Sequence, residues 1–408
     1  MADRKKGSGP FFWKLCVASQ KKGPDPFFKK RVLTPFSLSK VGLFLAAVGL
    51  AGCSGNPGPT PADPPRIENA KRVRVLWSAS VGGADGFTFL PALAGGSVYA
   101  AARDGTVTRL DDKTGRVGWR TRLDLRLSGG VGADERTVAV ASEEGEVVAL
   151  DVEKGTVRWR ARVSSEVLAP PAIGAGLVLV RSIDNRVFAF GAEDGKRRWV
   201  YQRAPSSLVV RTPAGITISG PLAYAGFPGG KLAAIALENG ALRWEATVGA
   251  PRGATELERV ADVIGEPAVQ EREVCAAAYR SRIACYDAAS GRQLWGRDVA
   301  SLSGVSLDAR YAFVADDRGA LHALDRSNGQ SVWKQDKLTH RQLSTPLAGG
   351  DAVAVGDFEG YVHFLARETG NFVARRSTGG GAVRAALRRL ADGVLVQTVD
   401  GSLVALAL

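Results

Sequence analysis

The sequence lacks the short motifs that mark common enzyme classes. It has no nucleophile elbow, no phosphate-binding P-loop and no G-x-G-x-x-G segment after a strand. Its three histidines, His322, His340 and His363, have no cysteine or carboxylate at metal-ligand spacing. We therefore predict no catalytic centre, no metal site and no cofactor, and we interpret the histidines as structural or surface residues.

Long hydrophobic runs and strongly charged tracts are also missing. The apolar run at residues 41–52 has twelve residues, whereas a membrane-spanning helix needs about twenty. The formal net charge of +13 suggests a nucleic-acid partner, but residues 1–52 carry +8 of it and the remaining charge is dispersed. A mildly basic body with dispersed charge is a weak footprint for nucleic acid, so we predict no such binding.

The short apolar run has the form of a secretory signal. It follows a basic stretch that ends at Lys40, and residues 50–53 read Leu-Ala-Gly-Cys. This ending is similar to a bacterial lipobox, which predicts a leader over residues 1–52 and lipidation of Cys53. A buried helix with a chance cysteine is the alternative, but the following SGNPGPTPADPP cannot continue a helix.

The segments that flank the lipidation site set its context. The leader is long for a signal, and a translation start near Val32 or Val41 would shorten it. Ser54 indicates passage to the outer membrane in bacteria that use aspartate there as an inner-membrane retention mark. Residues 53–70 form a proline-rich tether, so the body at residues 71–408 is held near a membrane and not in it.

The body carries an internal repeat in which a polar turn, an apolar strand and a glycine precede a tryptophan by four residues. Seven tryptophans follow one another at intervals of 38 to 51 residues: Trp77, Trp119, Trp159, Trp199, Trp244, Trp295 and Trp333. An eighth position falls at Ala374, which keeps Gly370 but lacks the aromatic ring. Each copy is too small to bury its own apolar face, so the copies must stack.

Each copy is predicted to contain four short strands. In the first copy three of them are residues 97–102, 107–111 and 116–123, and the fourth precedes them near FLPALAG. Four strands per forty residues indicate a β-propeller, with the tryptophan packed between adjacent blades. Only 34 residues follow Ala374, and the strand that ends at Trp77 supplies the rest of that unit. We predict an all-β, eight-bladed β-propeller closed by pairing of its N- and C-terminal strands.

Two neighbouring copies are longer than the others, with insertions after Trp199 and Trp244. Both insertions follow the same strand of the blade, so both are expected on one face. The first carries Leu208, Val210 and Arg211, a pattern that resembles a protein-binding hot spot more than a catalytic pocket. The second contains TELE, a capping box that predicts a helical turn. Two ordinary loops that pack on each other are the alternative.

The four cysteines divide into two groups. Cys16 lies in the leader and Cys53 is the lipidation site, whereas Cys275 and Cys285 flank the hairpin VCAAAYRSRIACYD. The hairpin places the last two nearly opposite each other on paired strands. In an oxidising periplasm this placement predicts a cross-strand disulfide, and two small buried thiols are the alternative.

These features together resemble the family of the outer membrane protein assembly factor BamB. The resemblance includes the lipobox and tether, and within the body it covers roughly residues 72–408. Its most specific segments are GATELERVADV at 253–263, THRQLSTP at 339–346 and VGDFEGYVHFL at 355–365. The missing aromatic at Ala374 is also similar to the family pattern.

The resemblance implies a non-catalytic scaffold lipoprotein of the β-barrel assembly machinery, anchored at the periplasmic face of the outer membrane of a Gram-negative bacterium. Its implied partners are BamA, other Bam subunits and unfolded outer-membrane β-barrel proteins, with no cofactor. The family's Leu-x-Leu-Arg contact segment falls on Leu208, Val210 and Arg211, with valine in place of the second leucine. A second contact segment falls on residues 262–264, where Asp262 is kept and the second aspartate is replaced by isoleucine.

Two other functions are compatible with a propeller. Dehydrogenases that use pyrroloquinoline quinone share such blades, but their adjacent cysteine pair and the extra length of their substrate lid are missing here. A lipoprotein propeller that senses a ligand or binds peptidoglycan is the third hypothesis. The GATELER segment favours the assembly factor over both alternatives.

Overall fold

The computed structural model distinguishes two compact units, residues 1–58 and residues 59–408, and the second unit contains the repeats. The residues that the structure describes are 59–204, 208, 210–251, 253–255 and 260–408. The leader, Cys53 and all but the first residue of the TELE segment lie outside the described residues. The predictions made for them therefore stay predictions.

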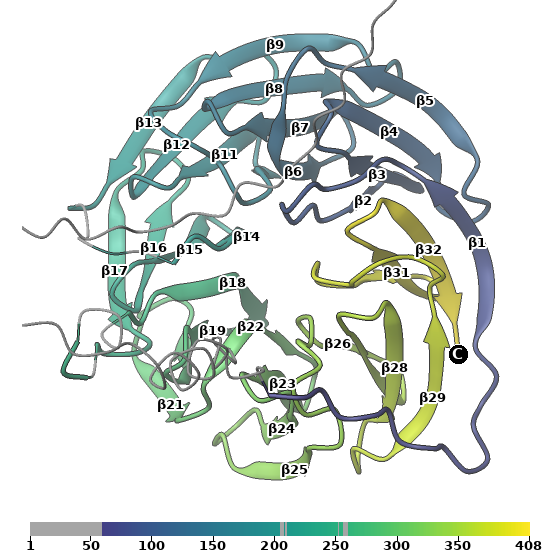
Figure 1. Cartoon of the computed structure of the whole chain (residues 1–408). Coiled ribbons are helices and arrows are strands. Elements are labelled where there is room, and N and C mark those ends of the chain that lie inside the picture. Colours follow the sequence, from purple (N-terminus) through teal and green to yellow (C-terminus); the bar gives the residue numbers. More distant parts are fainter. Residues whose placement is uncertain (1–58, 205–207, 209, 252, 256–259) are drawn as a thin grey trace, which may run out of the picture. The chain divides into compact units, whose positions relative to one another are not determined.

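The second unit is a ring of eight antiparallel sheets with four strands each (Figure 1). Its described residues include no helix, and so none that is long and apolar enough to cross a membrane. The inner strand of each sheet lies near the centre of the ring and the fourth strand lies at the outside. This arrangement confirms the predicted eight-bladed propeller.

From the inner to the outer strand, the first four blades are β2 (Ala92–Ala94), β3 (Ser97–Ala101), β4 (Thr106–Asp111) and β5 (Val117–Arg122); β6 (Leu127–Ala133), β7 (Thr137–Ser142), β8 (Glu146–Asp151) and β9 (Val157–Arg162); β10 (Ala172–Gly174), β11 (Leu177–Ser182), β12 (Arg186–Gly191) and β13 (Arg197–Gln202); and β14 (Ile216–Ser219), β15 (Leu222–Phe227), β16 (Lys231–Ala236) and β17 (Leu242–Thr247).

The last four blades are β18 (Val263–Gln270), β19 (Glu273–Ala278), β20 (Ile283–Asp287) and β21 (Gln293–Arg297); β22 (Ser301–Leu307), β23 (Tyr311–Asp316), β24 (Leu321–Asp325) and β25 (Ser331–Gln335); β26 (Leu347–Gly349), β27 (Ala352–Gly356), β28 (Tyr361–Ala366) and β29 (Phe372–Ser377); and β30 (Arg388–Leu390), β31 (Gly393–Gln397), β32 (Ser402–Ala407) and β1 (Arg74–Ser80).

The ring closes in the eighth blade, where the first and last strands of the chain meet. β1 pairs antiparallel with β32, and Trp77 lies opposite Ala405 in their register. The sheet order β1-β32-β31-β30 confirms the closure predicted from the length of the last repeat. Strand pairing thus connects residues more than 300 positions apart in the sequence.

The tryptophan of each outer strand packs on a glycine turn of the next blade. The indole of Trp159 lies over Gly195, and its Nε1 donates a hydrogen bond to the carbonyl oxygen of Ala192 at 2.9 Å. Gly195 has a φ of 64°, and a Cβ atom there would lie 2.6 Å from the indole. The turn therefore needs glycine both for its backbone conformation and for close approach of the ring.

The missing eighth tryptophan has a structural reason. In the other seven blades the glycine turn connects the third strand to the fourth, but the eighth blade has no such turn, because its fourth strand is β1. Ala374 on β29 is fully buried and shares an apolar cluster with Val73, which precedes β1. The N-terminal segment thus packs where an indole would otherwise meet a glycine.

The two cysteines of the fifth blade lie on adjacent strands. Cys275 on β19 is directly opposite Cys285 on β20 in the register, and both side chains are fully buried. The structure joins their sulfur atoms across a sequence separation of 10 residues.

Substitution of one indole tests whether these contacts stabilise the ring. We expect Trp159→Ala to lower the free energy of unfolding by about 3–5 kcal/mol, because it opens a cavity between two blades. Val157→Ala on the same strand is the control, since the Val157 side chain is 40% exposed. Chemical denaturation monitored by circular dichroism measures both. An equal, small effect of the two substitutions would contradict the assigned role of the indole.

Candidate docking site

The two insertions lie on one face of the ring, as their spacing predicts. They are the connections β13–β14 (residues 203–215) and β17–β18 (residues 248–262), and each leads from an outer strand to the inner strand of the next blade. Connections of this type all emerge at the same edge of a blade. The two insertions therefore flank the fourth blade on a common face.

Asp262 connects the two insertions. It is only 5% exposed, and its Oδ2 accepts a hydrogen bond from the backbone N–H of Val210 at 2.6 Å. Its Oδ1 accepts a second hydrogen bond from the N–H of Gly229 at 3.1 Å. Buried carboxylates that accept backbone hydrogen bonds hold loops in place. The Asp262 carboxylate thus fixes the backbone at Val210 in the first insertion to the end of the second insertion.

A half-buried arginine, whose Nε is shielded from solvent, provides a positive charge near Asp262. Burial lowers the pKa of Arg181 to about 10, and the negative charge of Asp262 acts in the opposite direction. Arg181 therefore keeps its positive charge at neutral pH. Its Nη1 also lies 3.5 Å from the carbonyl oxygen of Ala214, at the end of the first insertion. The base of the insertions is thus a polar region with compensating charges.

Leu208 and Arg211 are exposed above this base. The Leu208 side chain is 43% exposed. The guanidinium of Arg211 forms two contacts with the carboxylate of Glu166, one of them between Nε and Oε2 at 3.1 Å. It also lies 5.3 Å from the ring centre of Phe87. The hydrogen bond to Glu166 raises the pKa of Arg211, so this side chain stays cationic in a defined orientation.

Phe87 and Glu166 extend the site onto other blades. Phe87 lies in the β1–β2 connection and Glu166 in the β9–β10 connection. Phe87 is also 4.2 Å from the guanidinium of Arg103, which is paired with Glu143 at 2.6 Å. Sequence patterns do not reveal these supporting residues, because they occupy ordinary-length connections. We call Phe87, Glu166, Leu208, Val210 and Arg211 the docking face.

An ion pair connects two non-adjacent blades, the fifth and the eighth, near the centre of the ring. Arg388 on the inner strand β30 and Glu266 on the inner strand β18 form two hydrogen bonds, of 3.0 and 3.1 Å. The charge of Glu266 raises the pKa of Arg388. Arg388 Nε also donates to the carbonyl oxygen of Pro91 at 3.2 Å. A ligand on the axis at this level would have to displace a paired, hydrogen-bonded arginine.

The segments 339–346 and 355–365 meet in a buried polar cluster. Arg341 is 2% exposed, and its Nε donates to Asp357 Oδ2 at 2.7 Å. Its other nitrogens contact Glu359 and the carbonyl oxygen of Ala62, the latter at 3.0 Å. The cluster therefore holds the N-terminal segment against the seventh blade.

Two of the three histidines pair with aspartates. His363 Nε2 lies 2.8 Å from Asp357 Oδ2, and His322 Nε2 lies 2.9 Å from Asp316 Oδ2 in the preceding blade. Burial lowers the pKa of His363. Burial alone would raise the pKa of Asp357, but the hydrogen bonds from His363 and Arg341 outweigh it and lower that pKa.

These histidine–aspartate pairs order the turns between the second and third strands of the sixth and seventh blades. In the described part of the chain, no group of three or more His, Cys, Asp or Glu side chains could hold a metal ion.

Comparison with known proteins identifies the family. The profile described as outer membrane protein assembly factor BamB matches residues 69–125 and 103–335. The chain belongs to the BamB family. The assembly factor BamB of Bordetella pertussis is 45% identical over 362 residues, which span 88% of this chain and 94% of the relative. That of Pseudomonas aeruginosa is 45% identical over 348 residues, which span 84% of this chain and 91% of the relative.

Solved structures show the same fold. The crystal structure of BamB from Moraxella catarrhalis matches with a TM-score of 0.76 and 24% identity, and the match covers 83% of this chain and all of that one. The quinohemoprotein alcohol dehydrogenase from Comamonas testosteroni matches with a TM-score of 0.64 and 13% identity, over 82% of this chain and 76% of the enzyme. At these identities both likenesses concern the fold alone.

Removal of the Asp262 carboxylate tests how the BamB-type insertions are held together. We expect Asp262→Ala to lower the free energy of unfolding by about 1–3 kcal/mol, because two partly buried N–H groups lose their acceptor. Hydrogen exchange at the Val210 and Gly229 amides should accelerate more than exchange elsewhere. The exposed Asp124→Ala is the control. Unchanged exchange at both amides would show that Asp262 does not hold this loop.

Proposed function

We propose that this chain is an outer membrane protein assembly factor that acts as a non-catalytic scaffold in the β-barrel assembly machinery. The observation that carries the proposal is the docking face. It combines an exposed leucine with an exposed arginine whose orientation is set by Glu166 and Phe87. Apolar and arginine side chains held in a fixed geometry are typical of protein-binding hot spots.

We infer that the partner at the docking face is BamA. Leu208 would enter an apolar pocket of the partner, and Arg211 would present its remaining donors to a carboxylate or to backbone carbonyls. Asp262 would act indirectly, since it is buried and both of its oxygens accept hydrogen bonds within the chain. Other Bam subunits would bind elsewhere on the same assembly.

The proposed location is the periplasmic face of the outer membrane, with lipid attached at Cys53. Lipidation rests on the Leu-Ala-Gly-Cys sequence at residues 50–53 and on the serine that follows. A disulfide between Cys275 and Cys285 supports a periplasmic location of the protein, because such bonds persist in oxidising compartments.

Unfolded outer-membrane β-barrel proteins are the proposed clients. Each outer strand has one edge without a partner in its own sheet, and β1 with 7 residues is one of them. An extended client segment could add to such an edge by main-chain hydrogen bonding. This contact would be weak and independent of client sequence, which suits a scaffold that handles many barrel proteins.

A quinone-dependent dehydrogenase is the second candidate, and it rests on fold likeness alone. The Arg388–Glu266 pair near the axis gives no support to a bound quinone at that level. The relatives that cover most of the chain are named as assembly factors. These observations favour the scaffold.

Charge reversal on the docking face tests the proposal. We expect Arg211→Glu to reduce co-purification with BamA from detergent-solubilised membranes by at least about 30-fold, the loss typical of a hot-spot residue. The new carboxylate would also be repelled by Glu166, so the loop would present a different surface.

Arg197→Glu is the matched control, because Arg197 is exposed on the outer strand β13 and has no side-chain partner among the described residues. This variant should co-purify with BamA to the same extent as the unchanged protein. Retention of BamA by both variants would exclude Arg211 from the interface.

A further inference from the structure

The N-terminal segment is fixed to the ring before it reaches β1. The N–H of Ala62 donates to Thr339 at 2.9 Å, Arg375 donates to the carbonyl oxygen of Pro65 at 3.2 Å, and the N–H of Lys71 donates to Val373 at 2.8 Å. Figure 1 shows this segment crossing the seventh blade on its way to the outer side of the eighth.

The proposed lipidation site, Cys53, is linked to this segment by a short stretch of chain. Pro59 is the first described residue of the ring unit, and Cys53 precedes it by six residues. Six residues span at most about 20 Å even when fully extended. A lipid attached to Cys53 would therefore hold its leaflet within this distance of Pro59, which begins the segment that contacts the seventh blade.

The outer wall at this position carries a cluster of free positive charges. Lys71, Arg72, Arg74 and Arg376 are all exposed, and none of their side chains has an ion pair or hydrogen bond among the described residues. Some exposed outer-wall arginines of other blades are paired; Arg160, for example, forms an ion pair with Glu146 at 2.5 Å. We call these four residues the blade 7–8 patch.

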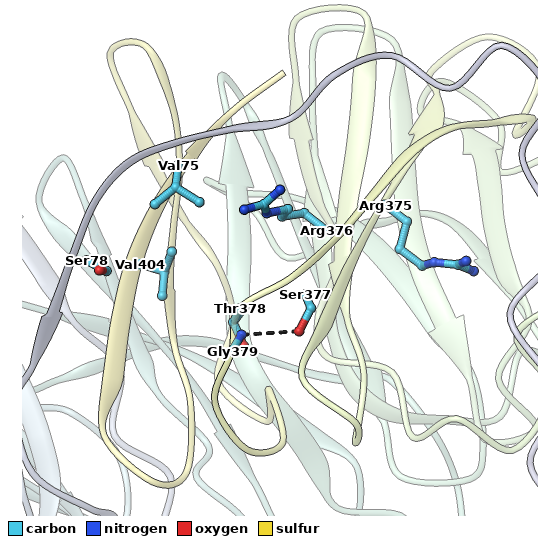
Figure 2. Close-up of a pocket in the computed structure, with 8 residues that line it drawn as sticks. All are labelled: Val75, Ser78, Arg375, Arg376, Ser377, Thr378, Gly379 and Val404. Atoms are coloured by element: carbon cyan, nitrogen blue, oxygen red, sulfur yellow. Dashed lines mark hydrogen bonds between the residues drawn. The ribbon is translucent and has the colours of Figure 1, made fainter.

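A groove between β29 and β1 adjoins the patch and shares Arg376 with it. It has a volume of about 520 Å³ and is lined by Val75, Ser78, Arg375, Arg376, Ser377, Thr378, Gly379 and Val404. Figure 2 shows the Arg376 side chain directed towards Val75 and Val404, whereas Arg375 points away from them. A guanidinium and hydroxyls suit a phosphate, and the valines suit the adjoining glycerol and upper acyl chain.

We propose that the blade 7–8 patch binds anionic phospholipid headgroups of the leaflet in which the Cys53 lipid is inserted. This inference rests on the lipid anchor in the proposed function. Each lysine or arginine near an anionic surface strengthens binding about fivefold, so four of them orient an already anchored protein effectively. The patch sets which side of the ring faces the bilayer and thereby which way the docking face points.

Energy transfer to a membrane dye tests this orientation. The mature acylated protein is reconstituted into vesicles of phosphatidylcholine alone or with added phosphatidylglycerol. A fluorophore is attached at Leu76→Cys on β1, where the side chain is 37% exposed, or at Leu242→Cys on β17 of the fourth blade, where it is 45% exposed. We expect the phosphatidylglycerol to increase transfer from position 76 more than from position 242.

Two triple variants separate specific binding from general charge. Arg72→Gln, Arg74→Gln and Arg376→Gln together should weaken the interaction with the anionic surface on the order of 100-fold and abolish the difference. The charge-matched control combines Arg116→Gln, Arg162→Gln and Arg197→Gln, three exposed arginines on or next to outer strands without ion pairs in the described region. This control should keep the greater increase in energy transfer at position 76. Salt at about 1 M should also abolish the difference, because it shortens the screening length to about 3 Å.

The outcomes distinguish this inference from the proposed function. Protein that fails to float with neutral vesicles has no acyl anchor, which overturns both. Protein that floats with both vesicle types but gives equal transfer in them overturns this inference alone. If both triple variants lose the phosphatidylglycerol-dependent increase in energy transfer equally, this inference is also overturned. The patch arginines then serve only to prevent edge-to-edge pairing of strands.

Discussion

The contact on which the rest of the structure depends is that between the tryptophan of one blade and the glycine turn of the next. A four-stranded sheet cannot bury both of its faces alone, and the indole fixes how far apart two sheets lie. The same contact recurs from Trp77 on Gly115 to Trp333 on Gly370. Its repetition makes a closed frame, and a closed frame can hold loops from distant parts of the sequence at defined positions.

The one blade without this contact is where the N-terminus joins the ring. No glycine turn is available to Ala374, and Val73 packs beside it instead. The preceding residues are then held by Arg341 and its buried carboxylate partners. Closure of the ring and fixation of residues 59–73 on the seventh blade are therefore two results of one topological fact.

Sequence periodicity was sufficient to predict the eight blades, the closing strand and the two long connections, because each depends on spacing along the chain. It could not predict the Arg211–Glu166 contact or the Arg388–Glu266 pair, which depend on the angle between blades. It also could not show that Asp262 is buried beneath the Val210 segment. It did not reveal the partners of His322 and His363 either, since an aspartate six residues before a histidine resembles no metal site.

The proposed function requires that Leu208 and its neighbours contact BamA directly. Photo-crosslinking in intact cells detects such a contact, with a photoreactive amino acid in place of Leu208 and, in a separate strain, in place of the similarly exposed Leu242. We expect a crosslink to BamA from position 208 and none from position 242. Crosslinks to BamA from position 242 alone, or from neither position, would contradict the proposed docking face.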